Sequence, residues 1–191
     1  MKFTPNYYAH SAVFFEVDKE GLREFYEGFM AALPYSLDEL FAKIWRTPGF
    51  SDWEANFHEN SLLRLADWLQ CSLEGEDVSG NAGKAPIPPE LCNAQPPLWD
   101  FTDASREIIV AAGMYYGEVM VRRNPGAAWV HFLKGKSMAD YGQPVIGGAV
   151  RRVINPVRVA TSFAFGVMDG SESRNGLLDA YAFWAQRILV S

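Results

Sequence analysis

Acidic side chains are the residues of this chain best suited to chemistry, because carboxylates can act as general acids or bases. Two clusters stand out, Asp38–Glu39 and Glu74–Asp77. Both lie in polar stretches where helix caps and solvated loops use carboxylates, whereas a catalytic acid is usually partly buried so that its pKa shifts. Glu118 is the only carboxylate within an apolar run, GMYYGEVMV, and is therefore the acid whose context best suits catalysis.

Three roles are open to Glu118. Arg122 follows it by four residues on the same predicted helix, an arrangement that favours an ion pair. Glu118 would also be structural if it accepted hydrogen bonds from the following hairpin or from Arg151 or Arg152. The third role is that of a catalytic acid. We favour the ion pair, which needs only the local helix.

The sequence contains no recognisable metal-ligating or nucleophilic motif. His10, His58 and His131 do not have zinc-ligand spacing, and we expect His131 to be a partly buried imidazole with hydrogen-bond partners. Cys71 and Cys92 form no CxxC pair, which favours free thiols, and a disulfide across the loop between them is the alternative. GSES at 170–173 is not a nucleophile elbow, and no glycine-rich phosphate loop occurs. The sequence thus predicts neither a metal nor a cofactor.

Charge is unevenly distributed along the chain, which has a net charge of −6. Residues 1–100 contain 16 acidic and 7 basic residues, or −9, whereas residues 101–191 contain 7 acidic and 10 basic residues, or +3. An acidic half favours a basic partner. It argues against nucleic acid, whose phosphates require a concentrated basic surface.

The composition is that of a globular protein, with 49% hydrophobic and 21% charged residues among 191. No apolar run approaches the roughly 18–20 residues that span a bilayer. The first residues lack the apolar core and cleavage site of a signal peptide. We expect one cytoplasmic domain of the α+β class, predominantly helical, with about five or six helices and one small β-hairpin.

The first predicted helix covers residues 19–33, where apolar residues recur at helical spacing. Asp18 is its expected N-cap. Pro34 is its expected end, because proline has no backbone N–H and clashes with the preceding turn.

Two capping boxes predict two further helices. In such a box a serine and a glutamate three residues later each satisfy a free backbone N–H. SLDE at 36–39 predicts a helix that ends near Trp45, and SDWE at 51–54 predicts a helix that reaches about Leu73. HENS at 58–61 is a possible interruption of the second of these helices.

Residues 74–100 are rich in proline and glycine and too long for an ordinary connection. We expect an ordered loop within the single domain, with a mobile tip over EGEDVSGNAG at 74–83.

The second half of the chain predicts a helix from about Asp103, a hairpin and two more helices. AAWVHFL at 127–133 and QPVIGG at 143–148 are the expected hairpin arms. Asn155 followed by Pro156 is typical of a helix start, and a last helix is expected over about 173–189.

Two glycines, Gly113 and Gly117, lie inside the helix predicted from Asp103, although glycine costs about 1 kcal/mol relative to alanine there. Four residues apart, they share one face of the helix. The spacing therefore predicts close approach by another element, with Tyr115 and Tyr116 packing over the contact.

The order of these motifs resembles that of a group of uncharacterised bacterial proteins. YYGEVMVRRNPGAAW at 115–129, the proline-containing QPVIGG and then INPVRVA at 154–160 match their aromatic-Gly-Glu helix, Trp strand and Asn-Pro helix. The resemblance covers about residues 103–185. Proteins of this kind are often immunity proteins, encoded beside secreted antibacterial toxins. The resemblance implies that function but carries over no site residues.

We therefore expect an immunity protein that neutralises a basic cognate toxin by stoichiometric binding, with no nucleic-acid or membrane partner. The expected contact residues are the acids Asp38, Glu39, Asp52, Glu54, Glu74, Glu76 and Asp77. Two alternatives stay open. One is an enzyme, such as a hydrolase that reverses a toxin's modification, with Glu118, His131 and Arg151 as first candidates. The other is a helical regulatory module that self-associates through aromatic residues.

Overall fold

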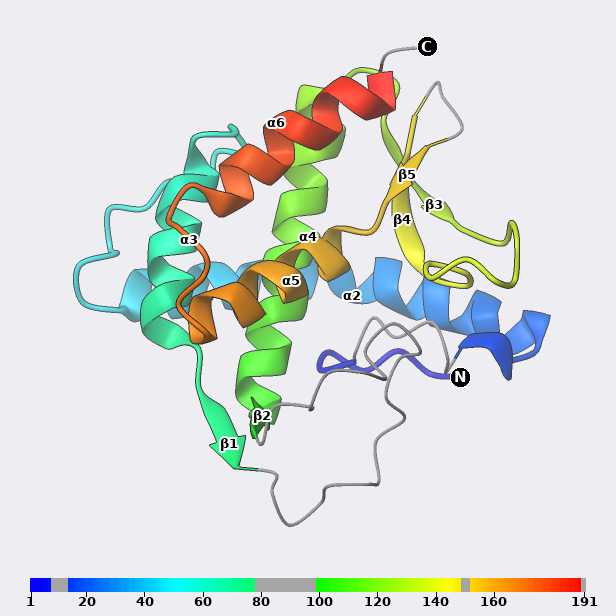
Figure 1. Ribbon diagram of the computed structural model, residues 1–191, viewed down its shortest axis with the longest axis horizontal. Coiled ribbons are helices and arrows are strands. Elements are labelled where there is room, and N and C mark those ends of the chain that lie inside the picture. Colours follow the sequence, from blue (N-terminus) through cyan, green and yellow to red (C-terminus); the bar gives the residue numbers. More distant parts are fainter. Residues whose placement is uncertain (8–13, 78–98, 149–151, 190–191) are drawn as a thin grey trace.

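The structure is a computed structural model that describes residues 1–7, 14–77, 99–148 and 152–189 (Figure 1). Its helices are α2 (Lys19–Arg46), α3 (Ser61–Ser72), α4 (Asp103–Arg123), α5 (Pro156–Met168) and α6 (Gly176–Leu189). Its strands are β1 (Gly75–Asp77), β2 (Trp99–Phe101), β3 (Ala128–His131), β4 (Pro144–Gly147) and β5 (Val153–Ile154). The predicted α+β, predominantly helical class is confirmed.

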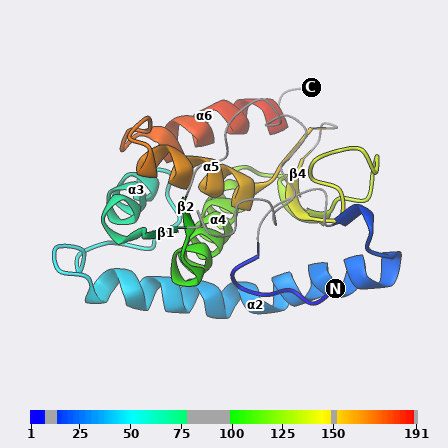
Figure 2. The ribbon, with the colours of Figure 1, turned by 60° about the horizontal axis from the view of Figure 1, so that its bottom comes forward.

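The helices form layers around α4. In Figure 2, α2 runs along one side of the molecule, α3 and α4 lie above it, and α5 and α6 cover the opposite side. Almost every residue of α4 from Ile109 to Met120 is buried, because helices pack on it from several directions. No helix in the described part of the chain is long and apolar enough to cross a membrane.

α2 is one continuous helix where the sequence predicted two. Asp18 caps it as expected, since its Oδ1 accepts a hydrogen bond from the Gly21 N–H at 2.8 Å. The prediction that Pro34 ends the helix is wrong: Pro34 lies inside the helix with its ring exposed. The buried row continues through it with unbroken helical spacing, in Phe29, Leu33, Leu37, Leu40 and Ile44. Burial of this row outweighs the one hydrogen bond that proline removes, and the capping box at 36–39 is wrong.

Residues 51–60 are not helical, so the second predicted capping box is also wrong and α3 begins only at Ser61. The interruption predicted at 58–61 is where the helix starts. Trp53 is buried in the core and its Nε1 donates to the Ser61 carbonyl at 3.2 Å. Phe57 has a left-handed backbone with φ of 56°. Packing of these two aromatic side chains keeps the segment out of a helix.

The two glycines of α4 admit neighbouring elements, as predicted. A Cβ on Gly113 would lie 2.6 Å from the Val157 Cα at the start of α5. A Cβ on Gly117 would collide with the Trp129 ring. The tyrosine part of that prediction is wrong for Tyr115, which points to the other side of α4 and stacks on Phe57.

The predicted hairpin is part of a three-stranded antiparallel sheet in the order β3-β4-β5. Trp129 pairs with Ile146 in the first ladder, and β5 adds two residues that the sequence did not reveal. Asn155 then caps α5, accepting from the Arg158 N–H at 3.1 Å, with Pro156 at the first helical position as predicted. α6 begins at Gly176, slightly later than expected.

β1 and β2 pair in antiparallel register, with Gly75 opposite Phe101. The start of the predicted mobile tip is therefore a strand, which holds together the two ends of the long loop. The rest of that loop, residues 78–98 with Cys92, lies outside the described residues.

Candidate functional site

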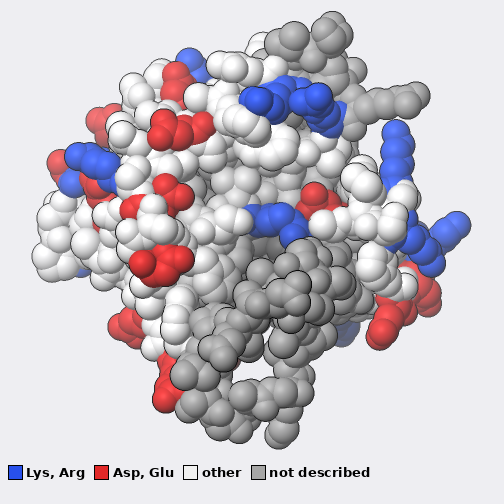
Figure 3. All heavy atoms as spheres, viewed as in Figure 1, with Lys and Arg blue, Asp and Glu red and all other residues white. Residues whose placement is uncertain are grey.

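The seven predicted contact residues are all exposed but occupy three places. Asp38 and Glu39 lie on α2, Asp52 and Glu54 on the turn after it, and Glu74, Glu76 and Asp77 at β1. In the view of Figure 3, acidic side chains predominate on the side of α3 and β1, and basic side chains lie mostly on the side of the β3–β5 sheet. On this face of the molecule the asymmetry along the sequence is thus also an asymmetry in space.

The structure brings the first four of these acids to one end of the molecule. Trp45 near the end of α2 donates its Nε1 to the Trp53 carbonyl at 2.8 Å, which joins α2 to the turn that carries Asp52 and Glu54. Glu74, Glu76 and Asp77 lie at the other end of α3 (Figure 1). The seven residues therefore do not form one surface, and the α2 end is the candidate site.

Charge at the α2 end is negative after local ion pairs are considered. Asp52 pairs with Arg64 at 3.0 Å and Lys43 lies 4.0 Å from Glu107, so these pairs contribute little net charge. Asp38, Glu39 and Glu54 form no ion pair with any residue that the structure describes. Arg46, exposed in the last turn, is the basic residue that opposes them.

Two exposed aromatic residues on the same helix, Tyr35 and Trp45, were missed by the sequence reasoning. Their exposed fractions are 74% and 48%. The signal that would have found them is helical spacing continued through Pro34, which places both opposite the buried row. Ending the helix at Pro34 hid this relation.

Glu118 has structural partners on both carboxylate oxygens. Arg122 donates to its Oε2 at 3.1 Å, which confirms the predicted ion pair. Trp129 of β3 donates its Nε1 to Oε1 at 3.0 Å, so the hairpin contact also exists. With its side chain 15% exposed, Glu118 links α4 to the sheet. Of the other two suggested donors, Arg151 lies outside the described residues, and Arg152 is exposed and forms no hydrogen bond with Glu118.

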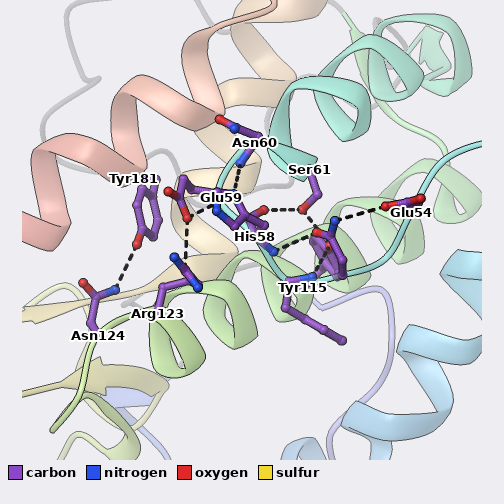
Figure 4. A network of polar contacts seen from close by, with 11 residues as sticks. Glu54, His58, Glu59, Asn60, Ser61, Tyr115, Arg123, Asn124 and Tyr181 are labelled. Carbon is purple, nitrogen blue, oxygen red and sulfur yellow. Dashed lines mark hydrogen bonds and ion pairs between the residues drawn. The ribbon is translucent and has the colours of Figure 1, made fainter.

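A polar chain fixes the segment before α3 (Figure 4). The Phe57 N–H donates to the Tyr115 hydroxyl at 3.2 Å, and the hydroxyls of Tyr115 and Ser61 lie 2.7 Å apart. Ser61 donates to the His58 carbonyl at 2.6 Å, so Tyr115 is the donor to Ser61. Burial raises the pKa of the Tyr115 phenol, which keeps it a donor. These bonds compensate the left-handed backbone at Phe57.

Replacing Tyr115 with phenylalanine is expected to lower the free energy of unfolding by about 1–3 kcal/mol, because a part-buried N–H and a buried hydroxyl lose their partner. Urea unfolding monitored by circular dichroism measures this. Tyr116→Phe is the matched control, since the Tyr116 hydroxyl is buried without a hydrogen-bond partner in the described structure. Equal losses of unfolding free energy in the two variants would contradict the stabilising role of the hydrogen bonds of Tyr115.

His131 is partly buried, as expected, but one ring nitrogen is not satisfied. Its imidazole stacks on Tyr26, with ring centroids 4.9 Å apart and planes 9° apart. The buried Nε2 has no hydrogen-bond partner within the described residues. Burial lowers the pKa of this imidazole from its ordinary value near 6.5.

The lowered pKa of His131 predicts an acid-dependent loss of stability. As pH falls below about 6.5, the unfolded chain takes up the proton first, so the free energy of unfolding decreases until the folded pKa is passed. His131→Phe keeps the stacking and removes the titration. Between pH 7 and 5 the variant should lose less stability than the wild type in urea titrations. If the unfolding free energies of the variant and the wild type depend on pH in the same way, His131 does not contribute to the acid-dependent loss of stability.

A cavity of about 330 Å³ lies between α5 and α6, with Val159, Phe163 and Trp184 among its apolar walls. Three of its polar side chains are hydrogen-bonded to one another. Arg158 donates to Asp140 at 2.9 Å, and Asn155 donates to Asp140 at 3.1 Å. These bonds tie the β3–β4 connection to α5. No cluster of three metal-ligating side chains occurs in the described ranges.

The chain matches no protein-family model, no curated protein and no solved structure. The resemblance in motif order over residues 103–185 therefore stays a prediction. The basis for assigning a function is the surface chemistry of the described residues.

Proposed function

We propose that the protein is an immunity protein that neutralises a basic cognate toxin by direct, stoichiometric binding. The observation that carries the proposal is the exposed acidic charge at the α2 end, where Asp38, Glu39 and Glu54 have no ion-pair partner among the described residues. Exposed acidic charge accelerates encounter with a basic protein and suppresses binding of acidic ones.

Rigidity of this end of the molecule supports a binding role. Asp38 and Glu39 stand on a helix of 28 residues that buries a continuous apolar row. The turn that carries Asp52 and Glu54 is held by the indole hydrogen bonds of Trp45 and Trp53. A surface fixed before binding loses little conformational entropy when the partner arrives, so more of the interaction energy appears as affinity.

The alternative of an enzyme has weaker support. Glu118, its first candidate, has one oxygen bonded to Arg122 and the other to Trp129. A carboxylate held in this way is already occupied by the fold, whereas a general acid or base must reach a substrate proton. We therefore place function on the acidic surface, where a toxin's active site would be occluded.

The proposal predicts that a gene beside this one encodes the toxin, and co-expression with that neighbour tests the proposal. Cells that carry both proteins should survive, and the two proteins should purify together as an equimolar complex. Protection at far below equimolar amounts would favour the enzyme. Neither binding nor protection would contradict the immunity function.

A further inference from the structure

We infer that the outer face of α2, formed by Tyr35, Asp38, Glu39, Ala42 and Trp45, is a docking surface for arginine side chains of a basic protein. The inference rests on the proposed function for the identity of that protein, the toxin. The chemistry of the surface itself follows from the exposed aromatic residues and the charges between them.

The outer face lies opposite the buried row of α2. Tyr35, Ala42 and Trp45 are separated by seven and three residues, so their side chains leave the helix on one side. Tyr35 and Trp45 are about 15 Å apart along the helix axis, at about 1.5 Å per residue. Asp38, Glu39 and Ala42 lie between them along the helix, so the carboxylates stand between the two aromatic side chains.

The two aromatic rings are exposed without serving the core. Tyr35 is 74% exposed, and Trp45 is 48% exposed although its indole is fixed. The Trp45 Nε1 bond to the Trp53 carbonyl and the Phe41 ring, 6.0 Å away, hold that indole in place. Tyrosine and tryptophan are the residues most often central to protein interfaces. An exposed indole that is already held in one orientation loses little conformational entropy when a partner binds to it.

Arginine suits this surface better than lysine does. The planar guanidinium stacks on aromatic rings and also donates two parallel hydrogen bonds to a carboxylate. An ammonium group is more strongly hydrated and cannot make the paired contact. Two carboxylates that stand between two exposed aromatic side chains therefore favour a partner rich in arginine.

Arg46 gives an internal check on the sign of the effect. It is exposed one position after Trp45 and forms no ion pair in the described part of the chain. Its positive charge should oppose an arginine-rich partner. Removing Arg46 should therefore strengthen binding, whereas removing Asp38 and Glu39 should weaken it.

Calorimetric titration of the purified protein with nona-arginine and nona-lysine peptides at low salt tests the inference without the toxin. Nona-arginine should bind about fivefold more tightly than nona-lysine. Asp38→Asn with Glu39→Gln should weaken nona-arginine binding about tenfold, and Arg46→Gln should strengthen it about twofold. Tyr35→Ala with Trp45→Ala removes both exposed rings and should remove most of the preference for arginine, and circular dichroism checks that these variants fold.

The matched control is Glu16→Gln with Asp179→Asn, which removes two exposed charges elsewhere. It should change nona-arginine affinity by less than about twofold. Equal affinity of the wild type for both peptides, or an equal loss in the control and in the Asp38–Glu39 variant, would overturn the inference. Normal toxin binding by the α2 variants would also overturn it while leaving the proposed function intact. A wild type that fails to bind the toxin would overturn the proposed function instead.

Discussion

Replacing Gly117 with alanine is expected to lower the free energy of unfolding by about 3 kcal/mol, although alanine is the better helix former by about 1 kcal/mol. The new methyl group would collide with the Trp129 ring and lie 3.2 Å from the Pro156 Cγ. Trp129 has little room to yield, because its Nε1 is bonded to Glu118 and its ring contacts Phe29. The clash is therefore relieved only by moving the sheet away from α4.

Thermal and urea unfolding of Gly117→Ala measure this loss. Gly176→Ala is the control, because the nearest atoms to its Cβ belong to the flexible end of the Glu172 side chain. The free energy of unfolding of that control should stay within about 0.5 kcal/mol of the wild-type value. If Gly117→Ala is as stable as the control, then close packing of Trp129 does not require glycine at position 117.

Reversing the charge of the four acids at the α2 end is expected to weaken toxin binding by at least about 100-fold, or about 2.7 kcal/mol. The change is Asp38→Lys, Glu39→Lys, Asp52→Lys and Glu54→Lys. The association rate should fall most, since exposed charges of opposite sign steer the encounter of two proteins. The dependence of affinity on salt should also decrease, because fewer charge pairs remain to be screened. Surface plasmon resonance at several salt concentrations measures all three quantities.

A second quadruple variant separates charge from location. Lysine at Glu16, Glu74, Glu76 and Asp179 changes the net charge equally but leaves the α2 end intact. Its affinity for the toxin should stay within about tenfold of the wild type. If the two quadruple variants behave alike, net charge alone governs binding and the α2 end has no special role. If neither variant changes affinity or salt dependence, the contact surface is elsewhere.

Local signals in the sequence were sufficient for much of the fold. Asp18 and Asn155 were identified as caps because a helix start depends on a few adjacent residues. Gly113 and Gly117 indicated a close contact, because glycine destabilises a helix and is retained there where a larger side chain would clash. Helical spacing and alternation likewise indicated α4 and the β3–β4 hairpin.

The errors came from places where tertiary packing outweighs a local rule. Pro34 did not end α2, because the buried row on its other side holds the helix together. The segment around Trp53 and Phe57 is not helical. Trp53 is buried in the core and Phe57 stacks on Tyr115, and these contacts hold the backbone in a non-helical conformation. The capping box at 36–39 lies inside a helix that already begins at Lys19, whereas the residues after the box at 51–54 are not helical at all.

The sequence indicated the acidic residues of the candidate site but not its aromatic residues. Asp38, Glu39, Asp52 and Glu54 were selected as exposed acids, and the structure places them at one end of the molecule. Tyr35 and Trp45 were not selected, because their common face exists only if α2 continues through Pro34. Glu74, Glu76 and Asp77 were grouped with them by charge alone, which carries no information about distance in space.

Titration of a fixed amount of the proposed cognate toxin with the purified protein, followed by the toxin's residual activity, tests the proposed immunity function most directly. Direct binding predicts a linear loss of activity that ends at one equivalent of protein. The same titration with the four-lysine variant at Asp38, Glu39, Asp52 and Glu54 should leave the toxin active at that point. Unchanged toxin activity beyond one equivalent of the wild-type protein, or full inactivation at a small fraction of an equivalent, would contradict neutralisation by stoichiometric binding.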